Sequence, residues 1–172
     1  MKKGLKRPLE LAIEIASSEP YTISFSEGHE PRIVEAAVEA VNLGIAKIIL
    51  VGKVEKVKHQ LAKYPCSYPD RIKIHDPTRS SLIKEFSKSY YELRKHKGIT
   101  YEDAKKQATS NLVYAALLVK NGHADGTLSG AVETTSNVVK TAIWVLGKAT
   151  QVKTVSSCFL IFPKSHEPMI YA

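Results

Sequence analysis

The sequence predicts an α/β fold with three layers, in which helices cover both faces of a mostly parallel sheet. Between residues 21 and 74, short β-rich runs alternate with amphipathic helical patterns, and this order is typical of right-handed βαβ units. Residues 45–51 are nearly all apolar, as expected for a parallel strand that is covered on both faces. Together these observations favour an αβα sandwich.

The first elements follow from apolar spacing and from proline and glycine. Residues 5–18 show helical spacing that stops before Pro20. Residues 21–25 form a short β-rich run, the first predicted strand. The next helix begins at Glu30-Pro31, because proline is tolerated in the first turn, and it ends at 42–44. Its apolar stripe consists of Ile33, Val34, Ala37, Val38 and Val41.

The middle of the chain continues the alternation and then becomes helical. After the strand at 45–51 we expect a helix at 54–61 and a strand at 72–74. We expect a charged helix at 79–97. A second helix begins at 100–103, with acidic residues in its first turn, and an apolar helix follows at 111–120. The predicted buried side of the charged helix consists of Leu82, Phe86, Tyr90 and Leu93.

The last part of the chain predicts a helix and a hairpin. The helix runs from about 137 to 146, a β-rich run covers 152–162, and a turn at 164–168 leads into a final strand. We expect residues 1–150 to form an N-terminal α/β domain and 151–172 to begin a second, truncated one. Cys158 is predicted in the core of the strand, and Cys66 in a loop.

Residues 122–137 form the stretch around which the chain is organised. Glycines and other small residues let backbone approach a ligand closely, and the hydroxyls of 134–136 precede a helix whose first N–H groups favour an anion. The sequence therefore predicts a phosphate site. The alternative is a turn that caps its own helix and binds nothing.

The composition of the chain argues against a membrane protein, a disulfide-rich protein and a metalloprotein. With 172 residues and 44% hydrophobic content, the chain is one domain, or one domain plus part of another. It has no apolar run that would span a bilayer and no secretory signal, so we expect no membrane association. The two cysteines do not suggest a disulfide scaffold and the histidines never pair at metal spacing. A cytoplasmic protein without a metal site is the expectation.

The formal net charge of +8 suits anionic metabolites as well as nucleic acid. The lysines are scattered over helical stretches, and aromatic residues do not alternate with basic ones as a stacking platform for bases requires. We therefore expect anionic small molecules and no nucleic acid as partners.

Four ordered motifs resemble one enzyme family. Residues 124–131, ADGTLSGA, followed by Thr134-Thr135, resemble the A-D-G-x-x-S-G-A-x-x-T-T signature of bacterial phosphate acetyltransferases. The other three matching stretches are ISFSEG at 23–28 with Arg32, GIAKIILVG at 44–52, and YELRKHKGIT at 91–100. The resemblance covers nearly all of residues 20–172.

This resemblance implies an activity and a fold. The family exchanges acetyl between acetyl phosphate and coenzyme A, which is a substrate rather than a permanently bound cofactor, and it tends to form homodimers. The implied architecture is isocitrate/isopropylmalate dehydrogenase-like, here incomplete at its C-terminus. Since no residue matches the family's catalytic Ser-Arg…Asp segment, we expect a fragment that is inactive alone. The alternatives are a non-catalytic acyl-phosphate or coenzyme-binding module, or an enzyme for a longer acyl group.

The resemblance also implies binding residues. Arg94 matches a family arginine implicated in binding the coenzyme's phosphate, and Lys140 stands where the family usually has a second arginine. Glu133 occupies a place often held by histidine, where its charge repels an anion unless it pairs with Lys140 or points away. The predicted phosphate cradle consists of Ser129, Gly130, Thr134 and Thr135.

Glu27 and Arg32 follow the first predicted strand, at the edge where open parallel sheets bind ligands. Each has two interpretations. Glu27 either reaches the cleft or caps its own turn, and Arg32 is either a cleft cation or a partner of Glu35.

Overall fold

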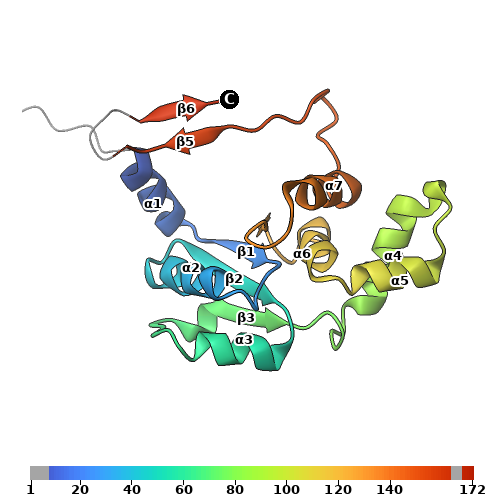
Figure 1. Cartoon of the computed structure of the whole chain (residues 1–172), viewed down its shortest axis with the longest axis horizontal. Helices are drawn as coiled ribbons and strands as arrows, with labels where there is room; N and C mark the ends of the chain where they lie inside the picture. Colours follow the sequence, from blue (N-terminus) through green and yellow to red (C-terminus); the bar gives the residue numbers. More distant parts are fainter. Residues whose placement is uncertain (1–7, 164–167) are drawn as a thin grey trace, which may run out of the picture.

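A computed structural model describes residues 8–163 and 168–172, and it confirms the α/β fold. Its centre is a four-stranded parallel sheet with the order β3-β2-β1-β4 (Figure 1). The strands are β1 (Tyr21–Phe25), β2 (Ala46–Val51), β3 (Ile72–His75) and β4 (Gly126–Leu128). Ile23 of β1 pairs with Ile48 of β2 on one side and with Gly126 of β4 on the other.

Helices form the two outer layers. One face of the sheet packs against α2 (Pro31–Asn42) and α3 (Val54–Leu61). The other face packs against α6 (Asn111–Lys120), which is in turn covered by α4 (Ile83–Arg94), α5 (Tyr101–Ala108) and α7 (Thr135–Val145). Two short 3-10 turns, η1 (Pro69–Arg71) and η2 (Lys95–Lys97), precede β3 and follow α4.

Strand β2 shows why the sequence at 45–51 is apolar on both faces. Ile48 and Leu50 belong to the core under α2 and α3, whereas Ile49 and Val51 belong to the core under α6. All four are at most 4% exposed. Side chains of a strand alternate between the two faces of a sheet, so consecutive positions between two helix layers are apolar, whereas Lys47 near the beginning of the strand is exposed.

The charged helix is shorter than the predicted 79–97, although Phe86 and Tyr90 are buried as expected. Asp76 accepts hydrogen bonds from the Thr78 backbone N–H and hydroxyl, at 2.9 and 2.7 Å, and the Leu82 N–H donates to Ser80 Oγ. These side-chain bonds offer the backbone an alternative to helical bonding, so α4 begins only at Ile83. Thr100 and Asp103 form the predicted capping box of α5.

The ends of the chain differ most from the prediction. Helix α1 (Pro8–Ser18) agrees with it, but the predicted start at residue 5 lies outside the described residues. Of the β-rich run at 152–162 only β5 (Phe159–Ile161) is a strand, paired antiparallel with β6 (Met169–Tyr171). This hairpin stands apart from the main sheet, with its apolar side chains exposed (Figure 1). The predicted turn at 164–168 falls almost entirely on residues outside the described part.

The two cysteines behave differently. Cys66 lies in a loop, as predicted, and packs against the core under α2. The prediction that Cys158 is a core residue of a strand is wrong, because it is exposed and precedes β5. An apolar run is buried only where a second layer covers it, and in the described residues no layer covers this hairpin.

Candidate functional site

A pocket lies at the edge of the sheet where the segments that follow two neighbouring strands, β1 and β4, run to opposite faces. Strand β1 continues into α2 on one face of the sheet, whereas its neighbour β4 continues into α7 on the other face. Open α/β sheets bind ligands at such a switch point, beyond the carboxyl ends of the strands. Residues after β1 and after β4 both line the pocket, so it sits at this point.

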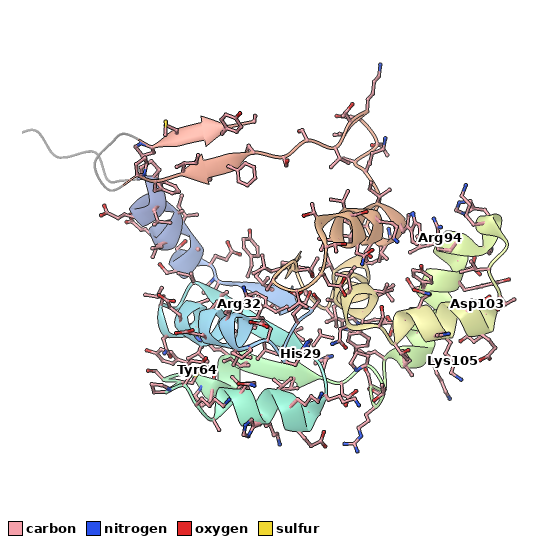
Figure 2. The ribbon with its side chains drawn as sticks, viewed as in Figure 1. His29, Arg32, Tyr64, Arg94, Asp103 and Lys105 are labelled. Atoms are coloured by element: carbon pink, nitrogen blue, oxygen red, sulfur yellow. The ribbon has the colours of Figure 1, made fainter. Side chains whose placement is uncertain are left out.

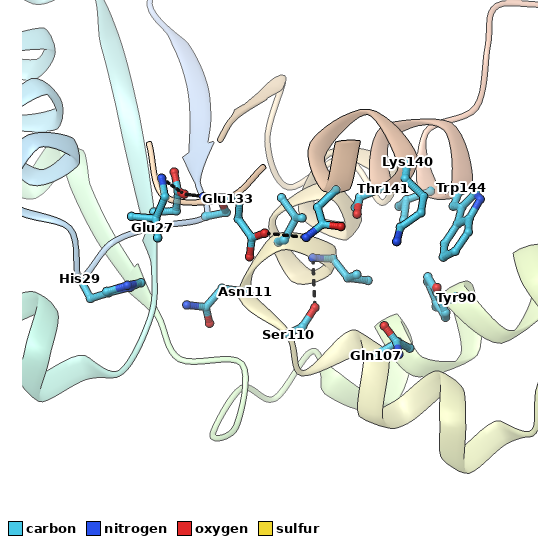
Figure 3. Close-up of a pocket in the computed structure, with 16 residues that line it drawn as sticks. Glu27, His29, Tyr90, Gln107, Ser110, Asn111, Glu133, Lys140, Thr141 and Trp144 are labelled. Carbon is cyan, nitrogen blue, oxygen red and sulfur yellow. Dashed lines mark hydrogen bonds between the residues drawn. The ribbon is translucent and has the colours of Figure 1, made fainter. Parts of the chain in front are cut away.

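The pocket has a volume of about 670 Å³ and a wall of mixed polarity. This size is typical of small-molecule sites. Figure 3 shows Glu27, His29 and Glu133 at one end, and Tyr90, Lys140 and Trp144 at the other. The remaining wall residues are Ser26, Gln107, Ser110, Asn111, Leu112, Val113, Val132, Asn137, Thr141 and Val145.

The Glu27 carboxylate organises the loop after β4. Its Oε2 accepts hydrogen bonds from the backbone N–H groups of Gly130 (3.0 Å) and Ala131 (2.9 Å). Its Oε1 accepts from Val132 and Glu133, each at 2.7 Å. Consecutive N–H groups that converge in this way form an anion-binding nest. Here the nest holds an anion that belongs to the protein.

Glu27 is only 3% exposed, and its ionisation reflects two opposing effects. Burial by itself raises the pKa of a carboxyl group, but the four backbone hydrogen bonds stabilise the carboxylate more strongly. The net result is that the pKa of Glu27 lies below its ordinary value. A carboxylate held in this way is a structural anion and a poor proton acceptor.

Two further contacts fix the same loop to the end of β1. The Ser26 hydroxyl donates to Ser129 Oγ at 2.8 Å, and Arg32 Nη2 donates to the Ala131 carbonyl at 3.0 Å. The Arg32 Nε also donates to Glu30 at 2.6 Å. These contacts, together with those of Glu27, hold the loop after β4 against the end of β1.

The opposite end of the pocket is cationic and aromatic. Lys140 Nζ lies 5.2 Å from the centroid of the Trp144 ring, and Arg94 Cζ lies 4.1 Å from the same centroid. Figure 2 shows Arg94 on the side of α4 that faces α7. The Arg94 charge also reaches Tyr90, where it partly offsets the burial that raises the pKa of that phenol. This end therefore suits a phosphate group.

Helix α6 supplies the polar floor between the two ends. Ser110 Oγ accepts from the Val113 N–H and caps the helix, and Asn111 is its first residue. Across the pocket, the Asn137 side-chain amide donates to Glu133 Oε2 at 3.2 Å.

The comparison with known proteins decides the family. The family described as phosphate acetyl/butaryl transferase matches residues 9–172. The chain belongs to this family. It is 34% identical over 153 residues to the phosphate acetyltransferase of Thermoanaerobacterium thermosaccharolyticum, covering 89% of this chain and 46% of that one. It is 35% identical to that of Acetivibrio thermocellus, covering 89% and 45%.

Solved structures agree. A phosphotransacetylase from Streptococcus pyogenes superposes with a TM-score of 0.85 at 28% identity, over 94% of this chain and 49% of that one. The EutD phosphotransacetylase from Staphylococcus aureus gives 0.82 at 26% identity, over 94% and 48%. The chain therefore spans about half the length of these relatives.

The structure brings only some of the predicted binding residues into the pocket. Glu27 and Lys140 line it, whereas Arg94 is not a wall residue and lies over the ring of Trp144, which is one. Ser129 bonds Ser26, Thr134 caps α7 by accepting from the Asn137 N–H, and Thr135 is an exposed first residue of that helix. The Gly130 N–H expected to hold phosphate donates instead to Glu27. Helix α7 begins two residues before the predicted Asn137, because Thr134 is its cap.

The two residues with alternative interpretations differ in outcome: Glu27 reaches the cleft, which is one of its two predicted roles, whereas Arg32 has neither of its predicted roles. Arg32 pairs with Glu30 and the Ala131 carbonyl rather than with Glu35, and it is not part of the pocket wall. Glu27 does not cap its own turn but binds a loop more than a hundred residues away. Glu133 binds Asn137, and in the described residues it makes no ion pair with Lys140.

Several wall residues were not found from the sequence. Trp144 and Tyr90 occupy helix positions that also suit core packing, and only the packing of α4 against α7 turns them toward the pocket. Ser110 and Asn111 are detectable as a polar pair before an apolar helix, although that pattern alone indicates a cap.

Two absences concern the described residues only. No group of histidine, cysteine, aspartate and glutamate side chains there is arranged to hold a metal ion. None of the helices in residues 8–163 has the length and apolar character that crossing a bilayer requires.

Proposed function

We propose that the chain is part of a phosphate acetyltransferase, which transfers acetyl between acetyl phosphate and coenzyme A. In this reaction the coenzyme thiol loses its proton, sulfur bonds to the acyl carbon, and the carbon–oxygen bond to phosphate breaks. Coenzyme A is a substrate, and no resident cofactor or metal enters the proposal. The observation that supports it best is the switch-point pocket in a chain of this family, with a cationic end that no carboxylate of the described residues neutralises by an ion pair.

The pocket supports a role in binding rather than in proton transfer. Lys140 and Arg94 supply positive charge for phosphate groups. Glu27 is unsuitable as the base for the thiol, since four N–H groups hold its carboxylate. None of the 172 residues matches the family's Ser-Arg…Asp segment, so we propose that the base lies outside this chain.

A two-part assay tests the proposal. Purified residues 1–172 are assayed for acetyl-coenzyme A formation from acetyl phosphate, and coenzyme A binding is measured by calorimetry. We expect binding without turnover. Turnover is expected when the coding sequence downstream of residue 172, where the genome encodes one, is restored. Turnover by the isolated chain contradicts the fragment proposal, and absence of coenzyme binding contradicts the assigned role of the pocket.

A second candidate is a non-catalytic module that binds an acyl phosphate or the coenzyme. It is favoured by two departures from the family pattern, Lys140 in place of arginine and Glu133 in place of histidine. The restored chain distinguishes the two: binding without turnover there supports the module.

Further parts of the proposal rest on the composition of the sequence and on the resemblance. Residues 1–150 are proposed as the N-terminal domain and 151–172 as the beginning of a second. The protein is proposed to be cytoplasmic and homodimeric, to bind neither nucleic acid nor membranes, and to use acetyl rather than a longer acyl group. Gel filtration and a series of acyl phosphates of increasing length test the oligomeric state and the acyl preference.

A further inference from the structure

The Trp144 indole contacts two cationic side chains, Arg94 and Lys140, at one end of the pocket. Arg94 is the last residue of α4 and Lys140 lies one turn before Trp144 on α7. Both charged groups nevertheless lie within 5.2 Å of the same ring centroid. A tryptophan face is the strongest aromatic site for a cation, at ring distances up to about 6 Å. One side chain thus contacts two positive charges from two helices.

In the part of the chain that the structure describes, neither Arg94 nor Lys140 forms an ion pair, although Lys95 nearby is paired with Glu92. Two flexible side chains of like charge would otherwise separate into solvent. Each of them instead lies near the same indole, and Trp144 itself lines the pocket while remaining 38% exposed.

We propose that Trp144 is a positioning residue, which orients Arg94 and Lys140 so that together they bind a phosphoryl group of the coenzyme. The inference rests on the proposed function for the identity of the ligand. Pre-orienting the two side chains lowers the ordering cost of binding. The guanidinium supplies paired N–H donors and the ammonium a point charge, so the arrangement selects a phosphoryl group over a single carboxylate.

The protein carries its own probe, because Trp144 is the single tryptophan of the chain. Its emission is recorded while coenzyme A, dephospho-coenzyme A, inorganic pyrophosphate or potassium chloride is added to residues 1–172. We expect a saturable change with the phosphate-bearing ligands, and no saturable change with potassium chloride at matched ionic strength.

Affinity is then measured by calorimetry on W144F, which keeps an aromatic face, and on W144L, which keeps only apolar bulk. We expect W144L to weaken coenzyme A binding about fivefold to tenfold and W144F to recover part of that loss, since phenylalanine attracts cations less strongly than tryptophan. The matched control is I143A, at an exposed position of the same helix that does not line the pocket. Circular dichroism confirms folding of each variant.

The outcomes separate the two proposals. A W144L defect seen with coenzyme A but not with dephospho-coenzyme A identifies the phosphomonoester as the bound group, and a defect with both identifies the diphosphate. Equal affinities of wild type, W144F and W144L overturn the role of Trp144 and leave the proposed function intact. If wild type binds no coenzyme A, the proposed function fails; the phosphoryl site then stands if pyrophosphate changes the emission, and falls if it does not.

Discussion

The Glu27 carboxylate and the Glu133 backbone N–H are joined by a 2.7 Å hydrogen bond across 106 residues of sequence. With the bonds to Gly130, Ala131 and Val132, this contact ties the loop after β4 to the end of β1. The anion-binding nest is therefore occupied by a carboxylate of the protein itself, and we propose the Lys140 end of the pocket for the ligand's phosphate.

Replacing Glu27 by glutamine tests whether this carboxylate holds the loop. Glutamine offers one carbonyl oxygen and places an amide NH₂ group against N–H donors, so part of the buried backbone is left without an acceptor. We expect E27Q to lower the free energy of unfolding by about 2–4 kcal/mol, measured by urea denaturation. The control is E35Q, at an exposed position of α2, which is expected to change it by under about 0.5 kcal/mol. Similar losses in both variants would contradict the role given to Glu27.

The pH dependence of stability offers an independent test. Because the pKa of Glu27 is lowered in the folded protein, the unfolded chain binds more protons between the folded value and the ordinary value of about 4.3. The stabilisation is therefore complete above the ordinary value and is lost as the pH falls through the folded value. We expect the difference in unfolding free energy between wild type and E27Q to shrink on acidification below about pH 4.3. A difference that stays constant down to the acid transition would exclude this linkage.

Whether a structural feature can be predicted from the sequence depends on how far apart in the chain the interacting residues are. The apolar run of β2 and the capping box of Thr100 and Asp103 are local patterns, and both appear as predicted. The acceptor role of Glu27 is invisible locally, since it depends on β4 lying beside β1. Likewise the contact of Arg94 with Trp144 arises only when α4 packs against α7.

Lys140 and Arg32 are expected to differ in their effect on coenzyme binding. Lys140 lines the pocket, whereas the Arg32 guanidinium is engaged by Glu30 and the Ala131 carbonyl. By calorimetry we expect K140A to weaken coenzyme A binding about tenfold and R32A to change it less than about twofold. K140R, which restores a bidentate donor, should strengthen binding several-fold. A larger loss in R32A than in K140A would reverse the assignment.

A buried polar cluster at the end of β3 predicts a second pH effect nearer neutrality. The Tyr114 hydroxyl lies 2.6 Å from Ser80 Oγ and 3.1 Å from His75 Nδ1. Burial lowers the pKa of His75, and the charges of Lys73 and His123 lower it further. The free energy of unfolding is therefore highest when the pH is above the ordinary histidine pKa of about 6.5, and it falls as the pH drops toward the pKa of His75 in the folded protein. We expect thermal unfolding scans of wild type to show this decrease and those of H75Q to lack most of it; equal slopes would contradict the prediction.

Gly28 lies between two pocket residues, Glu27 and His29, and leaves no room for a side chain. A Cβ there would be 3.0 Å from the Val51 carbonyl oxygen and 3.2 Å from Leu50 Cβ, both part of the neighbouring strand. Because β2 is fully packed, we expect G28A to lower the free energy of unfolding by about 1–3 kcal/mol and to weaken coenzyme binding by displacing Glu27. The control is G122A, where φ is +77° and an added Cβ would have no atom within 4 Å apart from those of the adjacent residues. It carries backbone strain of about 1 kcal/mol without a clash and should leave binding unchanged. Urea denaturation and calorimetry on both variants separate the effect of the clash from that of backbone strain. A G28A protein with wild-type stability and affinity would show that β2 can move to accommodate the Cβ, and would contradict the prediction.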